Sequence, residues 1–114
     1  MLKQPKEYLK HILDEINFLL NSSKNISEGK FMRDETLRRA YSRSLEIIGE
    51  ATKQLPKEFT DKYPQTDWSL MAGMRDKLIH HYFGVDYAIV WDVVTNELPK
   101  LKPQIQKFVG KTIE

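Results

Sequence analysis

Apolar residues recur at the three- and four-residue spacing of an α-helix over most of this chain. The first stripe begins at Leu9 and continues at Ile12, Ile16 and Leu19, before the turn-forming run NSSKN that starts at Asn21. A helix that carries such a stripe has to bury it against other elements. This spacing predicts an all-α fold.

A second helix is expected over residues 34–55, where the apolar residues again keep helical spacing. Its acidic start at Asp34 and Glu35 suits the positive end of a helix dipole. Pro56 ends it, because the residue before a proline is pushed out of the α region. The preceding SEGKF, residues 27–31, is either a separate opening turn or an extension of the same helix.

Two helical segments are expected next. One covers residues 56–63, PKEFTDKY, between two prolines. The other, capped by Thr66 or Asp67, carries apolar residues from Trp68 to Ile79 and reaches two adjacent histidines, with Gly84 as its terminator.

The last helical region is expected from Asp86 to about residue 113, bent or split near Pro99 and Pro103. Its YAIVWDVV run contains β-branched residues and by itself has the composition of a strand, but nothing nearby offers it a partner strand. The whole pattern predicts a compact bundle of four to five helices.

The composition is that of one globular domain spanning residues 1–114. The chain is 40% hydrophobic and 30% charged, and it has no cysteine, which excludes disulfides and thiolate metal sites. Its N-terminus lacks the features of a secretory signal, and no apolar run approaches the roughly 20 residues needed to span a bilayer. We expect a cytoplasmic protein with no membrane partner. The net charge of +2 neither requires nor excludes a polyanionic partner.

Rare titratable groups gather in the segment AGMRDKLIHHYFGVDY, residues 72–87, where His80 and His81 are adjacent and follow Arg75 and Asp76. On a continuous helix Asp76 and His80 would be neighbours on one face. Arg75 and His80 would be about 140° apart around that helix and about 7.5 Å apart along it. They converge only if the arginine side chain curls back, if the helix unwinds at His81, or if a second chain supplies part of the cleft.

Two simpler interpretations of this cluster compete with a catalytic one. A histidine pair at a helix C-terminus favours the local dipole, and Arg75 could pair with an acid on a neighbouring helix, which would make the cluster structural. A metal site is disfavoured, because adjacent histidines point to different faces and no HExxH-type pair is present. We therefore expect no metal and no cofactor.

The same segment resembles a known family. MRDKLIHHY fits the Arg-x4-His-x-Tyr motif of the HEPN superfamily, with Arg75, His80 and Tyr82 in the three motif positions and Asp76 in the polar position that often follows the arginine. RSLEIIGEATKQLP and DWSLMAGMRDKLIHHYFGVDYAIVWDVVTNELPKL are both similar to HepT-type proteins, the toxin branch of that superfamily. The likeness covers well over half of the chain, and no motif position departs from the pattern.

The resemblance implies a compact helical bundle that forms a homodimer and places the motifs of both protomers at a shared cleft. The implied activity is metal-independent endoribonuclease cleavage by the toxin of a type VII toxin–antitoxin pair. The implied partners are an RNA substrate and a minimal nucleotidyltransferase antitoxin of the MntA type. That antitoxin would add AMP to the motif tyrosine, Tyr82.

The chemistry of the residues suits this activity. His80 is predicted to act as general acid and base, because histidine exchanges a proton near neutral pH. Arg75 is predicted to clamp the phosphate and stabilise the charge that develops there. Asp76 would orient His80, and Tyr82 would contact phosphate or ribose. His81 is the alternative proton carrier, although the motif register favours His80.

A competing interpretation is a non-catalytic dimeric binding module that docks a nucleotidyltransferase or holds a nucleotide in the same cleft. The intact motif favours the enzyme, whereas the modest net charge favours the binding module.

Overall fold

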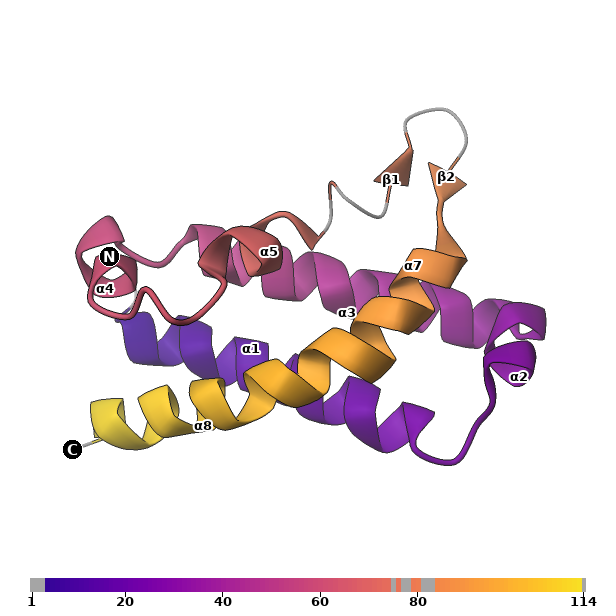
Figure 1. The fold of residues 1–114 in the computed structure, drawn as a ribbon, viewed down its shortest axis with the longest axis horizontal. Coiled ribbons are helices and arrows are strands. Elements are labelled where there is room, and N and C mark those ends of the chain that lie inside the picture. The colour runs from indigo at the N-terminus through magenta and orange to yellow at the C-terminus, as the bar shows by residue number, and fades with distance from the viewer. Residues whose placement is uncertain (1–3, 75, 77–78, 81–83, 114) are drawn as a thin grey trace.

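Three long helical runs form the body of this protein in a computed structural model (Figure 1). Helix α1 (Pro5–Ser23) packs against α3 (Glu35–Lys53) and against the C-terminal helix α8 (Leu98–Ile113). The structure describes residues 4–74, 76, 79–80 and 84–113. The all-α prediction is confirmed for these residues, apart from one pair of two-residue strands. None of the helices described is long and apolar enough to cross a membrane.

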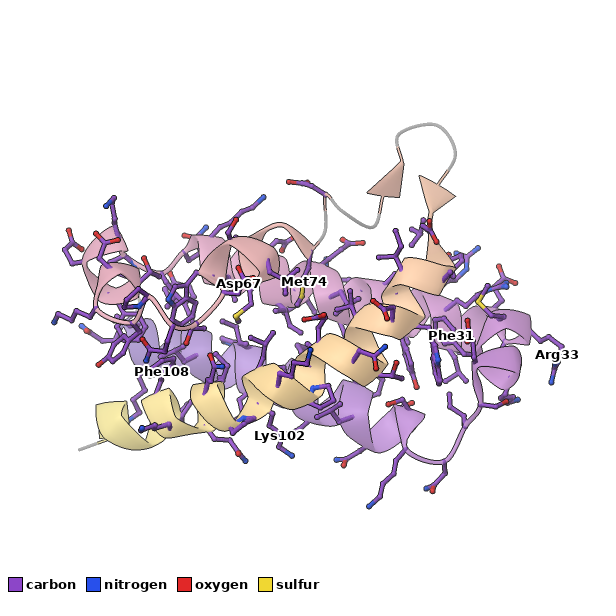
Figure 2. All side chains as sticks on the ribbon, in the orientation of Figure 1. Phe31, Arg33, Asp67, Met74, Lys102 and Phe108 are labelled. Carbon is purple, nitrogen blue, oxygen red and sulfur yellow. The ribbon has the colours of Figure 1, made fainter. Side chains whose placement is uncertain are left out.

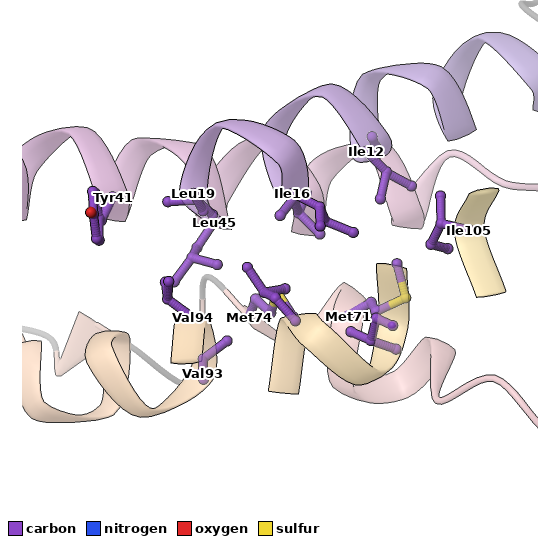
Figure 3. Close-up of a cluster of buried hydrophobic side chains, with 14 of the residues drawn as sticks. Ile12, Ile16, Leu19, Tyr41, Leu45, Met71, Met74, Val93, Val94 and Ile105 are labelled. Atoms are coloured by element: carbon purple, nitrogen blue, oxygen red, sulfur yellow. The ribbon is translucent and has the colours of Figure 1, made fainter. Parts of the chain in front are cut away.

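Helix α1 follows the predicted stripe. Pro5 begins it, in the first turn where a missing backbone N–H costs nothing. The four residues of the stripe are completely buried, and Figure 3 shows three of them, Ile12, Ile16 and Leu19, among the core side chains. The fourth is Leu9. Local spacing was therefore sufficient to identify the inner face of this helix.

The SEGKF segment, left open by the sequence, begins a separate short helix, α2 (Glu28–Arg33). Ser27 caps its start by accepting a hydrogen bond from the Lys30 N–H. Asp34 separates α2 from α3, because its backbone is extended while its carboxylate caps α3 by accepting from the Leu37 N–H at 3.1 Å. That hydrogen bond lowers the pKa of Asp34 below its ordinary value.

Two short helices lead from α3 toward the histidines: α4 (Lys57–Asp61) and α5 (Trp68–Ala72). Asp67 caps α5 by accepting from the Leu70 N–H at 2.9 Å, one of the two caps predicted. The Trp68 indole N–H donates to the Tyr63 carbonyl at 3.0 Å, and its ring stacks on Phe108 of α8. These contacts fix the start of α5 against the end of the bundle.

The prediction that the helix beginning near Asp67 continues to the histidines is wrong. Helix α5 ends at Ala72, where Gly73 caps it, and helical backbone recurs at Met74 and Asp76. Ile79–His80 then forms strand β1, which pairs antiparallel with β2 (Gly84–Val85). The apolar spacing did not reveal this pairing although the partners lie only four and six residues apart, because strand formation depends more on pairing and burial than on residue type.

The C-terminal helical run is α7 (Tyr87–Asp92), η2 (Val93–Glu97) and α8, and Asp86 caps it as predicted. The YAIVWDVV run is helical. Of the two predicted outcomes near the prolines, a bend or a split, the split does not occur. The helix widens to a π-type turn in which the Leu98 N–H donates to the Val93 carbonyl, and Pro103 lies inside α8. Such a turn accommodates Pro99, which has no N–H to donate.

Candidate active site

The Arg-x4-His-x-Tyr motif lies in the chain between α5 and α7 (Figure 1). Arg75, His81 and Tyr82 fall outside the described residues, and only the backbone of His80 falls within them. Their predicted roles therefore stay predictions. The structure describes the frame of the site: the residues that hold each end of the motif segment and one charged side chain between them.

Met74 holds the N-terminal end of the motif segment. Its side chain is 1% exposed and belongs to the hydrophobic core, where it lies near Val94 and Leu45 in the close-up (Figure 3). Figure 2 shows the same methionine at the end of α5, directed into the bundle. Because Met74 immediately precedes Arg75, the motif begins at a point fixed by core packing.

The strand pair holds the C-terminal end of the segment. Ile79 is opposite Val85 and His80 is opposite Gly84. Gly84 has φ +81°, a backbone conformation that residues with a side chain rarely adopt, which explains why glycine occupies this position. Val85 is half-buried against the core. Figure 1 shows the two strands standing away from the helical bundle, so the backbone of His80 lies on a projection.

Asp76 is exposed and forms an ion pair with Lys53 in the last turn of α3, at 3.5 Å between Oδ2 and Nζ. The expected alignment of Asp76 and His80 on one helical face is wrong, because His80 is extended and does not keep helical spacing with Asp76. The expected separation of 140° between Arg75 and His80 assumed one continuous helix, so it does not apply either.

Lys53 was missed by the sequence analysis. A lysine in the last turn of a helix is common because it complements the helix dipole, and its distance from the motif in the sequence carries no sign of a contact. Only the packing of α5 on α3 brings Lys53 and Asp76 together.

A hollow of about 700 Å³ over the α4–α5 connection is lined by residues between Thr60 and Ser69. The described residues that line it all belong to α4, α5 or the connection between them, so we do not assign it to the motif segment. In the part of the chain that the structure describes, no three histidine, cysteine or acidic side chains gather as a metal ion would require.

Comparison with known proteins identifies the family of this chain. The family model described as ribonuclease HepT-like matches residues 8–108. A protein of Caldanaerobacter subterraneus subsp. tengcongensis, named as a candidate RNase, is 51% identical over 110 residues, which cover 96% of this chain and 98% of that protein. The "Probable ribonuclease HepT" of Thermococcus cleftensis is 40% identical over 108 residues, which cover 95% of this chain and 98% of that protein.

A candidate RNase of Methanocaldococcus jannaschii is 42% identical over 112 residues, which cover 98% of this chain and 92% of that protein. No solved structure matches the chain. The family match spans the helical body as well as the motif segment, and each of these relatives is aligned along nearly its full length. On this evidence the chain belongs to the HepT-like family of ribonucleases.

Proposed function

We propose that this protein is the toxin of a type VII toxin–antitoxin pair and cleaves RNA without a metal ion, using Arg75 and His80. The observation that carries the proposal is an intact Arg-x4-His-x-Tyr motif in a chain of the HepT-like ribonuclease family. The described frame is compatible with it. The strand that contains His80 projects from the bundle, where a long polymer can reach it (Figure 1).

In the proposed reaction the ribose 2′-oxygen attacks the adjacent phosphorus. The bond from phosphorus to the 5′-oxygen breaks, and a cyclic phosphate remains. His80 removes the proton of the 2′-hydroxyl, and the imidazolium so formed, or His81, returns a proton to the leaving 5′-oxygen. Arg75 binds the phosphate and stabilises its additional negative charge in the transition state. Because the substrate is cellular RNA, the proposed location is the cytoplasm.

We expect the active protein to be a homodimer, since a shared cleft would bring motif groups of two protomers to one RNA strand. Size-exclusion chromatography with light scattering at micromolar concentration should give twice the mass of 13.4 kDa. A monomer that cleaves RNA at the same concentration would contradict the shared cleft.

Tyr82 is the proposed point of control by the partner. A minimal nucleotidyltransferase, with ATP and magnesium, should attach at least one AMP to its hydroxyl: the tyrosine oxygen loses its proton and bonds to the α-phosphorus of ATP, and pyrophosphate leaves. The adduct would bring a negative phosphate and a nucleoside to the place that receives the RNA phosphate, where it would pair with Arg75 and repel the substrate backbone. Mass spectrometry of the intact chain and of its peptides should locate the adduct on Tyr82, and RNA cleavage should fall as it accumulates.

Tyr82→Phe should accept no AMP and should stay active in the presence of the partner enzyme. Tyr87→Phe is the matched control, because Tyr87 begins α7 only five positions away and its ring, which contacts Phe31 and Arg38, is retained in the variant. It should be modified and silenced like the parent. An adduct on another residue, or silencing of Tyr82→Phe by binding alone, would contradict this mechanism.

The competing function is a non-catalytic module that docks the nucleotidyltransferase. The net charge of +2 favours it, because proteins dedicated to nucleic acids usually carry a stronger positive bias. Expression of this chain alone distinguishes the two. A toxin arrests growth, and co-expression of a nucleotidyltransferase encoded beside it restores growth. A docking module has no effect on growth by itself.

A further inference from the structure

The contact between Lys53 and Asp76 differs from other ion pairs on this protein. Arg39–Glu35 and Lys57–Asp61 join residues one turn apart in a single helix. Lys53–Asp76 joins the end of α3 to the motif segment, at 3.5 Å. The partners are 50% and 67% exposed, so the pair lies at the surface, beside the motif arginine in the sequence.

Asp76 follows Arg75 directly in the chain, and its ion pair with Lys53 matters for that reason. If its carboxylate were free to turn toward Arg75, it would compete with the RNA phosphate for the guanidinium, which binds both groups through the same paired hydrogen bonds. It would also repel the RNA backbone. A lysine that binds the carboxylate places a positive charge beside it, which weakens the repulsion of the RNA backbone, and holds it against α3.

We propose that Lys53 is a positioning residue of the ribonuclease: it binds Asp76 and so keeps Arg75 available for the RNA phosphate. The inference rests on the proposed function. It replaces the prediction that Asp76 orients His80, whose helical geometry the structure contradicts. Together with the buried Met74, the ion pair holds the motif segment at two points on either side of Arg75.

The test is a charge exchange between α3 and the motif segment. The variants are Lys53→Glu, Asp76→Lys and the double variant with both changes, which restores an ion pair of opposite polarity at unchanged net charge. Lys53→Arg is the conservative variant. Lys57→Glu is the matched control, since it makes the same charge change in the exposed Lys57–Asp61 pair of α4.

Cleavage of bulk transfer RNA and of a messenger transcript should be measured as kcat and KM. Lys53→Glu and Asp76→Lys should each lower kcat by up to about tenfold, since each turns an exposed attraction into a repulsion. The double variant and Lys53→Arg should stay within about twofold of the parent, because each keeps an ion pair between the two positions. Lys57→Glu should leave kcat unchanged.

Two results would overturn the proposal. If Lys53 and Asp76 act only through long-range charge, the two single variants will shift KM in opposite directions and leave kcat unchanged. If Asp76 acts directly on His80, Asp76→Lys will lose activity and the double variant will not recover it.

Hydrogen exchange of the backbone amides in residues 74–80 tests, independently of RNA cleavage, whether Lys53 holds the segment. Exchange should be faster in both single variants and should return to the parent rate in the double variant. Unchanged exchange would show that Lys53 does not hold the segment. If the parent protein cleaves neither transfer RNA nor the messenger transcript, the proposed function is contradicted. The exchange rates would still show whether Lys53 holds the motif segment.

Discussion

Replacing Arg75 or His80 by alanine should lower RNA cleavage by a factor of roughly 10²–10³, the usual cost of removing one group that stabilises transition-state charge. Loss of His80 removes the proposed proton carrier, and loss of Arg75 removes the proposed phosphate clamp. Growth arrest on expression should disappear in both variants. Circular dichroism should show an unchanged helical fold, since the core of the described bundle is formed by other side chains.

Matched controls are available in the same chain. His11 is exposed on α1, and Arg39 is exposed on α3 in an ion pair with Glu35. His11→Ala and Arg39→Ala should cleave RNA like the parent. Cleavage should also persist in EDTA. A parent-like rate in either motif variant would contradict the assigned roles, and loss of activity in EDTA would show that a metal ion takes part.

Replacing Phe31 by alanine should lower the free energy of unfolding by about 3–5 kcal/mol, the range for a fully buried phenylalanine. Its side chain is 0% exposed and its ring centroid lies 4.9 Å from that of Tyr41 and 5.2 Å from that of Trp91. These contacts join α2 to α3 and α7. A helix as short as α2 does not form by itself, so it depends on this side chain.

Urea unfolding followed by circular dichroism measures this effect, and Phe18→Ala is its control. Phe18 also meets the ring of Tyr41, at 6.3 Å between centroids, but it is 45% exposed. Its replacement should cost about 1 kcal/mol or less, as surface changes usually do. Equal losses in the two variants would show that α2 is not held by burial of Phe31.

The helical body was predictable because its signals are local. The buried stripe of α1 follows from a spacing that the backbone geometry of one helix imposes. The caps at Asp67 and Asp86 are likewise local, since each carboxylate accepts from an N–H three residues later. The motif segment was identifiable by its residue types alone.

The geometry of that segment was not predictable in the same way. The sequence of residues 66–80 is compatible with one long helix, yet β1 forms because Ile79 and His80 pair with residues beyond the motif tyrosine. Near Pro99 the sequence indicates only that an ordinary helix is disturbed. The helix could either break there or continue through a wider turn. The burial of Val93, Val94 and Leu98 in the core favours a continuous helix with a π-type turn.

By itself, the sequence determined the helical class, the inner face of α1, the caps and the residue types of the motif, because each depends on neighbours within about one helical turn. The tertiary structure decided that His80 lies in a strand, that Met74 fixes the start of the motif and that Asp76 meets Lys53. The strand pairing is close in sequence, with His80 opposite Gly84, whereas the core contacts of Met74 and the Lys53–Asp76 ion pair join segments distant in the chain. They form only when helices pack, and neither residue type nor spacing specifies which partners packing will bring together.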